Sequence, residues 1–170
     1  GSIILSDYGK GVLTTNLTKE IIKIANKNNI KVLVDPKGKD YSKYKGSYTL
    51  TPNKKEAMEA TNIDIKDESS LIEALKSLKT QCSLEVSLIT LSEQGIAIFD
   101  DELTIKPTVA REVYDVTGAG DTVIASIAFA LGNNLDIKDA IYFANLAAGV
   151  VVGKIGSATT TLDEIYEYEY

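Results

Sequence analysis

The sequence predicts an α/β protein in which helices pack on a mostly parallel β-sheet. Short apolar segments rich in Val and Ile alternate with longer segments whose apolar residues have helical spacing. The first strand, helix and second strand follow one another within residues 3–34, which implies a parallel pair with a right-handed crossover. The chain has 170 residues, 44% of them apolar, which suits one globular domain with a substantial core.

The predicted strands are short, apolar and bounded by polar residues, Gly or Pro. They are residues 3–6, 31–34, 48–51, 86–91, 96–99 and 102–106. Pro36 and Pro52 mark the ends of the second and third strands, because proline restricts the residue before it and cannot donate to a sheet. The last two strands flank the acidic turn Asp100-Asp101 and are expected to form a hairpin.

The predicted helices begin at polar or glycine positions and carry periodic apolar residues. They run from the expected cap Asn16 to about residue 29, over 54–60 and 69–80, from 118 to about 131, and from 136 to about 154. Residues 7–15 and 37–47 are predicted loops. In residues 161–170, Glu and Tyr alternate, and we expect the end of this tail to fray.

Composition excludes several functions. The net charge of −6 leaves no general basic surface for nucleic acid. There is no histidine, which excludes Ser-His-Asp and Cys-His nucleophile activation and His-based metal sites. The single cysteine, Cys82, permits no disulfide within the chain and is expected to be a small buried residue. Acid–base chemistry would therefore use carboxylates, Lys or Tyr.

A glycine-rich turn at residues 115–121 is the strongest functional signal. Gly118 and Gly120 precede a long apolar helix, and Asp121 lies on its first turn. Unpaired N–H groups and the helix dipole at such an N-terminus suit an anion, and a carboxylate there could accept a proton from an attacking hydroxyl. A purely structural turn is the alternative.

The glycines of this chain do not form either of two common nucleotide-binding motifs. Val123 stands where a dinucleotide-binding motif needs its last glycine, three residues after Gly120. The stretch from Gly149 to Lys154 is too short for a Walker A loop, and Ile155 follows where Ser or Thr is required. We therefore interpret Lys154 as a cation at a helix C-terminus.

The residues after the third predicted strand allow two interpretations. Asn53 could be a helix N-cap, with Glu56 completing a capping box. Alternatively, both residues face the carboxyl edge of the sheet and hold a hydrated Mg²⁺ near phosphates, because Mg²⁺ keeps several waters and needs few carboxylates.

Three further features remain open between structural and binding roles. The turn from Ser92 to Gly95 is expected at the carboxyl edge of the sheet, where ligands bind. Asn145 is either a hydrogen-bonded core residue or a contact to a ligand base. Four lysines form either a phosphate-attracting patch or a solvated face, and they are Lys37, Lys39, Lys43 and Lys45.

Taken together, these motifs resemble the ribokinase family of sugar kinases. The resemblance rests on residues 115–121, on residues 51–56 and on residues 90–95, in the order found in that family. Within it, residues 5–11, 34–38 and 92–95 are most similar to the heptose-7-phosphate kinase domain of bifunctional ADP-heptose synthases. Many ribokinase relatives have Gly where this chain has Ser92.

The resemblance implies a ribokinase-like three-layer αβα sandwich and a role for each matching residue. Asp121 would be the catalytic base, and the N–H groups of Gly118, Ala119 and Gly120 would form the anion hole. The nucleotide-binding residues would be Asn53, Lys54, Lys55, Glu56, Ser92, Glu93, Gly95 and Asn145, the last near the adenine. ATP and Mg²⁺ would be the cofactors, with Glu56 holding the metal through water.

The resemblance also implies an activity and an incomplete domain. The expected reaction is ATP-dependent phosphorylation of the anomeric hydroxyl of D-glycero-D-manno-heptose 7-phosphate, toward ADP-heptose and lipopolysaccharide. Residues 3–170 would be the C-terminal part of the kinase domain, without its N-terminal half and lid. Independently of the resemblance, Gly1-Ser2 directly precedes the strand-like residues 3–5 and is expected to be a remnant of recombinant expression. We expect a cytoplasmic protein without nucleic-acid or membrane partners, homodimeric when intact.

Other functions stay open from the sequence. The chain could be another sugar kinase of the ribokinase family, with a different sugar. It could also be a nucleotide-binding or structural fragment without catalytic activity. A Rossmann oxidoreductase is less well supported, because the phosphate-binding fingerprint is absent.

Overall fold

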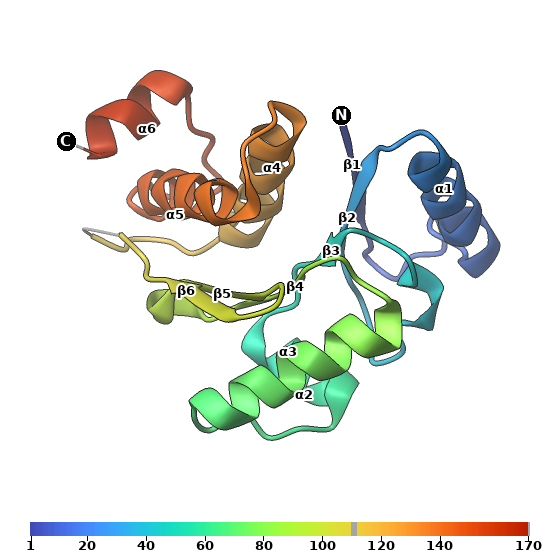
Figure 1. Ribbon diagram of the computed structural model, residues 1–170. Coiled ribbons are helices and arrows are strands. Elements are labelled where there is room, and N and C mark those ends of the chain that lie inside the picture. Colours follow the sequence, from blue (N-terminus) through green and yellow to red (C-terminus); the bar gives the residue numbers. More distant parts are fainter. Residues whose placement is uncertain (110–111, 170) are drawn as a thin grey trace. The chain divides into compact units, whose positions relative to one another are not determined.

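The computed structural model describes residues 1–109 and 112–169, which form two compact units. The first unit contains Gly1–Leu91 and Ala97–Ile105, and the second contains Ser92–Ile96 and the chain from Lys106 onward. The strands belong to the first unit except for their terminal residues Ile96 and Lys106, and the helices of residues 119–169 belong to the second unit (Figure 1). The predicted α/β class with a mostly parallel sheet is confirmed.

The strands form two three-stranded sheets, and within each sheet they follow one another in chain order. They are β1 (Ser2–Ser6), β2 (Lys31–Asp35), β3 (Thr49–Leu50), β4 (Ser87–Thr90), β5 (Ile96–Phe99) and β6 (Leu103–Lys106). β1 pairs in parallel with β2, and β2 in parallel with β3. A parallel bridge between Asn53 and Thr90, with the bond from Thr90 N to Pro52 O at 3.0 Å, joins β3 to β4. The residues after β1, β2 and β3 therefore share one edge of the sheet.

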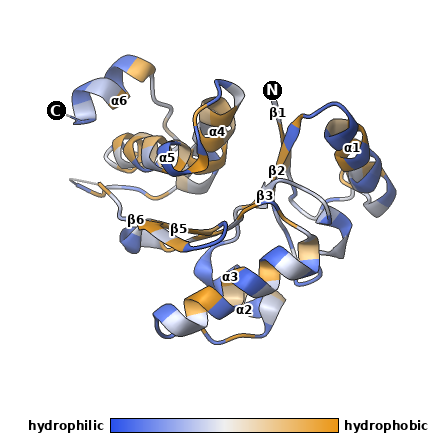
Figure 2. Ribbon diagram, in the orientation of Figure 1, coloured by the Kyte–Doolittle hydropathy of each residue, from blue (hydrophilic) through white to orange (hydrophobic). Residues whose placement is uncertain are grey.

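Three helices of the first unit share one core with the sheet. They are α1 (Thr15–Lys27), α2 (Lys54–Thr61) and α3 (Glu68–Cys82). Ile22 of α1, Ala57 of α2 and Leu75 of α3 pack in one cluster with Val32 and Val34 of β2. Apolar residues are concentrated in the strands, whereas much of α1 is polar (Figure 2). Cys82 is buried in this core as expected, and burial raises the pKa of its thiol to about 11.

The second unit contains the helices α4 (Ala119–Gly132), α5 (Ile137–Val152) and α6 (Leu162–Glu169). α4 and α5 pack together, and Leu146 and Val150 of α5 form a small core with Ile165 of α6. Gly149 permits this packing, because a Cβ there would lie 2.9 Å from the ring of Tyr168.

Several boundaries differ from the predictions for identifiable reasons. Asn16 is not the first helix cap, since the Thr14 hydroxyl accepts from Leu17 N at 3.3 Å and caps α1 two residues earlier. β1 begins at Ser2, one residue before the expected start. The predicted loop of residues 37–47 contains a short 3₁₀ helix, η1 (Ser42–Tyr44).

The C-terminal tail is helical as far as Glu169, and the expected fraying at Tyr170 lies outside the described residues. Lys154 was also interpreted incorrectly, because α5 ends at Val152. The ammonium of Lys154 instead donates to Thr159 O at 2.8 Å and to the Glu164 carboxylate at 2.6 Å, which joins α6 to the segment before it.

No helix within the described part of the chain is long and apolar enough to cross a membrane.

Candidate active site

The N-terminus of α4 is built from the glycine turn that the sequence singles out. Gly118 is the N-cap and has a φ of +81°, a left-handed conformation that favours glycine. Among the described residues, the N–H groups of Gly118 and Gly120 have no protein acceptor. The N–H of Ala119 donates to Val116 O at 3.1 Å, so it would have to leave this turn in order to bind an anion.

Asp121 lies on the exposed first turn of α4. Its carboxylate is therefore accessible to a substrate hydroxyl and stands beside the free N–H groups of the turn. This arrangement can bind an anion and accept a proton at the same place.

Asp115 fixes the turn, a role that the sequence reasoning missed. Its carboxylate accepts from Thr117 N at 2.9 Å and from Gly156 N at 3.1 Å, which links the turn to the segment after α5. Hydrogen bonds from Thr117 hold the pKa of Asp115 below its usual value. Asp side chains in turns often accept a hydrogen bond from the backbone N–H two residues further on, so the position of Asp115 two residues before Thr117 is a signal for this role.

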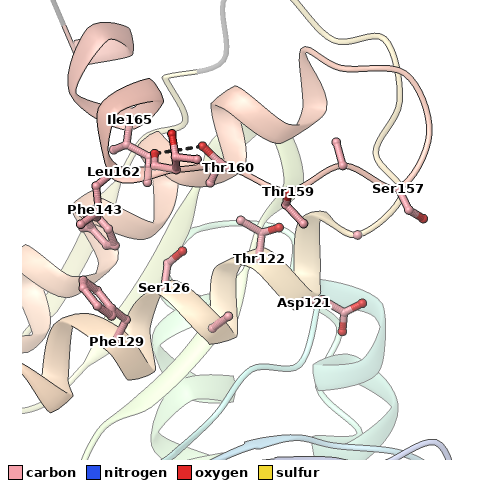
Figure 3. Close-up of a pocket in the computed structure, with 14 residues that line it drawn as sticks. Asp121, Thr122, Ser126, Phe129, Phe143, Ser157, Thr159, Thr160, Leu162 and Ile165 are labelled. Carbon is pink, nitrogen blue, oxygen red and sulfur yellow. Dashed lines mark hydrogen bonds between the residues drawn. The ribbon is translucent and has the colours of Figure 1, made fainter.

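A cavity of about 530 Å³ extends along α4 from Gly118 and Asp121. Figure 3 shows Asp121 at one end of this cavity and the rings of Phe129 and Phe143, whose centroids are 5.9 Å apart, at the other. Thr159, Thr160 and Leu162 line the opposite wall. Its size suits a small molecule.

Two of the predicted nucleotide-binding residues meet at the end of β6. The Asn145 side chain is buried in α5, and its amide donates to Lys106 O at 2.8 Å and to Pro107 O at 3.2 Å. Gly95 approaches the same segment, since a Cβ there would lie 2.0 Å from Lys106 O. The structure thus confirms the hydrogen-bonded core interpretation of Asn145, and the ligand contact stays a prediction.

Ser92 and Glu93 form an exposed one-turn 3₁₀ helix directly after β4, η2 (Ser92–Gln94). Ser92 has a φ of +54°, in the left-handed region, which gives a physical reason for the Gly found there in many ribokinase relatives. Neither residue lines the cavity along α4.

In the first unit, Asn53 and Glu56 form the predicted capping box. Glu56 N donates to the Asn53 side chain at 3.0 Å, and Asn53 N donates to the Glu56 carboxylate at 3.0 Å. Lys54 and Lys55 are exposed on the first turn of α2. Capping and ligand binding are compatible here. The capping box uses only one of the two carboxylate oxygens of Glu56, and this side chain is half-buried at the edge of the sheet.

A buried charge cluster that the sequence did not reveal lies after β1. The Asp7 carboxylate is ion-paired with Lys43 and accepts from Tyr44 OH at 2.7 Å. Burial raises the pKa of Asp7, but the hydrogen bonds from Lys43 and Tyr44 outweigh it and keep this pKa below its usual value. Lys43 therefore does not belong to a solvated face, whereas Lys37, Lys39 and Lys45 are exposed.

Comparison with known proteins identifies the class. The profile described as pfkB family carbohydrate kinase matches residues 4–164, and the chain belongs to this family of kinases. Arabidopsis thaliana ribokinase, solved with ribose and ATP, superposes with a TM-score of 0.87 at 20% identity, over 98% of this chain and 55% of that one. Phosphofructokinase-2 from Escherichia coli gives 0.84 at 19% identity, over 99% and 56%. The ribokinase-like fold is thereby confirmed.

Much more similar sequences point to a particular kind of relative. The protein named Bifunctional protein HldE from Aliarcobacter butzleri is 87% identical over 99% of this chain and 35% of its own length. Its namesake from Sulfurimonas denitrificans is 66% identical, with the same coverage. The chain thus spans about a third of the length of these relatives.

Proposed function

We propose that this chain carries the catalytic and nucleotide-binding part of a kinase that phosphorylates D-glycero-D-manno-heptose 7-phosphate at its anomeric hydroxyl. ATP would be the donor and the 1,7-bisphosphate the product. The observation that carries the proposal is the accessible Asp121 beside unpaired N–H groups at the N-terminus of α4, in a chain 87% identical to a relative named HldE. Residues 3–170 would be the C-terminal part of the kinase domain.

The proposed roles follow from the chemistry of each position. Asp121 accepts the proton of the anomeric hydroxyl as it attacks the γ-phosphorus. The N–H groups of Gly118 and Gly120 stabilise the charge on the transferring phosphoryl group, and Ala119 joins them if its turn hydrogen bond opens. The remaining proposed nucleotide contacts are Asn53, Lys54, Lys55, Glu56, Ser92, Glu93, Gly95 and Asn145.

Mg²⁺ is part of this proposal. Among residues 1–109 and 112–169, no group of three His, Cys, Asp or Glu side chains could hold a metal by itself. Glu56 has one carboxylate oxygen in the capping box, which fits a role in which it contacts a hydrated ion rather than surrounding it. Such an ion would neutralise charge on the ATP phosphates.

The test is a phosphorylation assay of the full-length protein against a panel of sugar phosphates. We expect turnover with D-glycero-D-manno-heptose 7-phosphate and ³¹P NMR detection of a new anomeric phosphate. Turnover with a different sugar only, or transfer to another hydroxyl, would overturn the substrate assignment. Light scattering on the same sample tests the proposed homodimer.

A nucleotide-binding segment without activity of its own is the second candidate. This candidate is favoured by the part of the fold that the chain contains, since the chain matches 55% of the length of the solved ribokinase. Titration of the 170-residue chain with ADP and Mg²⁺ separates the two candidates from a purely structural role. Heat of binding without turnover supports the second candidate, and no heat supports the structural role.

A further inference from the structure

Asn145 presents one side-chain oxygen next to the turn of residues 92–95. We propose that this oxygen accepts a hydrogen bond from the 6-amino group of adenine, and that Asn145 thereby makes the site selective for adenine over 6-oxopurines. The inference rests on the proposed function, in that the site binds a purine nucleotide. It adds the residue that selects the base.

The orientation of the Asn145 amide is fixed by its two acceptors. Nδ2 donates to Lys106 O at 2.8 Å and to Pro107 O at 3.2 Å. Only the NH₂ end of an amide can donate to carbonyl oxygens, so the group cannot be turned around without losing both bonds. The side chain is only 3% exposed, so packing within α5 also holds it in place. The position of Oδ1 is therefore fixed as well.

Oδ1 of Asn145 is unpaired and accessible. Within residues 1–109 and 112–169 it accepts no hydrogen bond. In the same part of the chain, the side-chain oxygens that are both unpaired and sealed from solvent belong to Thr18 and Tyr41. The Asn145 oxygen is not one of them, so it reaches the surface through a small opening. An unpaired oxygen on a buried side chain costs free energy until a ligand or a water molecule supplies a donor.

This oxygen lies beside the turn that is predicted to bind the nucleotide. A Cβ at Gly95 would lie 2.0 Å from Lys106 O, which is the same carbonyl oxygen that Asn145 binds. The backbone of the turn and the amide of Asn145 therefore meet at one atom. These residues and the glycine turn before α4 all belong to the second unit, so the site is built within one compact part of the chain.

The position of Asn145 along α5 favours a contact to the base. The carbonyl oxygen of Val152, the last residue of α5, accepts from Asp115 N at 3.2 Å, so this end of the helix adjoins the glycine turn. Asn145 lies seven residues earlier, about 10 Å back along the helix axis. In a nucleotide the ribose separates the base from the phosphates. Phosphates at the glycine turn therefore leave the base, rather than another phosphate, for Asn145.

The fixed amide distinguishes two kinds of purine. Adenine carries an amino donor at position 6, whereas guanine and hypoxanthine carry an oxygen acceptor there. Because the NH₂ group of Asn145 is engaged with two carbonyl oxygens, only the acceptor Oδ1 is available to the base. A 6-oxopurine would bring two acceptors together and leave both unpaired. The same geometry that binds adenine thus rejects the 6-oxopurines.

The test is isothermal titration calorimetry of the full-length protein with Mg²⁺ and a series of nucleoside diphosphates. ADP is compared with purine riboside 5′-diphosphate, which lacks the 6-amino group, and with IDP, which has oxygen there. Purine riboside 5′-diphosphate should bind about fivefold to tenfold more weakly than ADP, as expected for one lost hydrogen bond. IDP should bind more weakly still. In the kinase assay, the KM values of the triphosphates should follow the same order.

Asn145→Ala should remove this discrimination, so that the Kd values of ADP and purine riboside 5′-diphosphate agree within about twofold. Asn133→Ala is the matched control, because the Asn133 amide also donates to a backbone oxygen, Phe129 O at 2.8 Å, but at the exposed end of α4. That variant should discriminate as the wild type does. The comparison also separates this site from any other nucleotide site in the intact protein. If Asn145→Ala does not fold, the wild-type series still decides.

Equal Kd values for ADP and purine riboside 5′-diphosphate in the wild type would overturn the inference. Discrimination that persists in Asn145→Ala would overturn it too. If 2′-deoxy-ADP binds weakly while changes at position 6 have no effect, the oxygen contacts the ribose and the inference fails.

Failure of the proposed function is distinguishable from failure of this inference, because the titrations contain no sugar. Discrimination at position 6 without phosphorylation of the heptose phosphate would support the inference and contradict the substrate assignment. Phosphorylation of the heptose phosphate with equal KM values for ATP and ITP would do the reverse. Absence of binding for all three diphosphates would overturn the inference.

Discussion

The backbone of Gly95 passes so close to Lys106 and Pro107 that no side chain fits between them. A Cβ would lie 2.0 Å from Lys106 O and 2.7 Å from the carbonyl carbon of Pro107, and φ is +94°. Because these neighbours are backbone atoms, they cannot rotate away as a flexible side chain would. This contact holds the turn after β4 against the segment that Asn145 binds.

Gly95→Ala should therefore lower the free energy of unfolding by about 2 kcal/mol or more, from left-handed strain and steric overlap together. Urea denaturation measures the loss. Gly11→Ala is the control, since Gly11 has a φ of +90° but open space around it, and strain alone should cost about 1 kcal/mol. Equal losses in the two variants would contradict the account of Gly95.

Asp7 predicts a specific dependence of stability on pH. The pKa of the Asp7 carboxyl in the folded state lies below the unfolded value of 3.8. The ionised carboxylate therefore contributes its full stabilisation of the fold above about pH 3.8, and this stabilisation is lost as the pH falls through the folded-state pKa. Asp7→Asn should destabilise the protein at pH 7, and the difference from wild type should shrink below about pH 4. Urea midpoints at both pH values check this. A difference that stays constant down to pH 3 would rule out the ionised pair as its cause.

The helix caps show which ends of the helices can be predicted from the sequence. Asn53 and Asp136 were identified because a short polar side chain precedes a periodic apolar segment, and both cap their helices. Thr14 was missed because Asn16 is an equally good capping residue two positions later. α6 was missed because alternating Glu and Tyr do not have helical spacing, although Ile165 is buried and Glu164 pairs with Lys154.

Variants of Asn53 can separate capping from nucleotide binding. Asn53→Ala should cost about 1 kcal/mol of stability, because it removes the acceptor for Glu56 N. Asn53→Asp should keep the cap and the stability but raise the KM for ATP in the full-length protein, because a negative charge is placed near the phosphates. An unchanged KM for ATP in Asn53→Asp would remove Asn53 from the proposed nucleotide site.

For the whole molecule, the sequence predicted the fold class and family but not how the proposed site residues are held. The order of apolar segments was sufficient for the α/β class. The network of Asp7, Lys43 and Tyr44 was not predictable, because its members are up to 37 residues apart and meet only in the folded chain. Asn145 was ambiguous for the same reason, since its partners at Lys106 and Pro107 are distant in sequence.

The proposed nucleotide contacts can be tested in each unit by itself. Asn53 and Glu56 belong to the first unit, whereas Ser92, Gly118 and Asn145 belong to the second. In the full-length protein, ADP with Mg²⁺ should slow hydrogen exchange at residues 53–56 and at residues 92–95 and 118–121. Unchanged exchange in one of these segments would remove that segment from the proposed contacts.

The central claim is that Asp121 is the base for phosphoryl transfer at the N-terminus of α4, and steady-state kinetics of Asp121→Asn in the full-length protein test it most directly. Asparagine keeps the size and polarity of the side chain but cannot accept the proton. The account predicts that kcat falls about 100-fold or more while the KM for ATP stays within about twofold. A kcat close to that of the wild-type protein would contradict it.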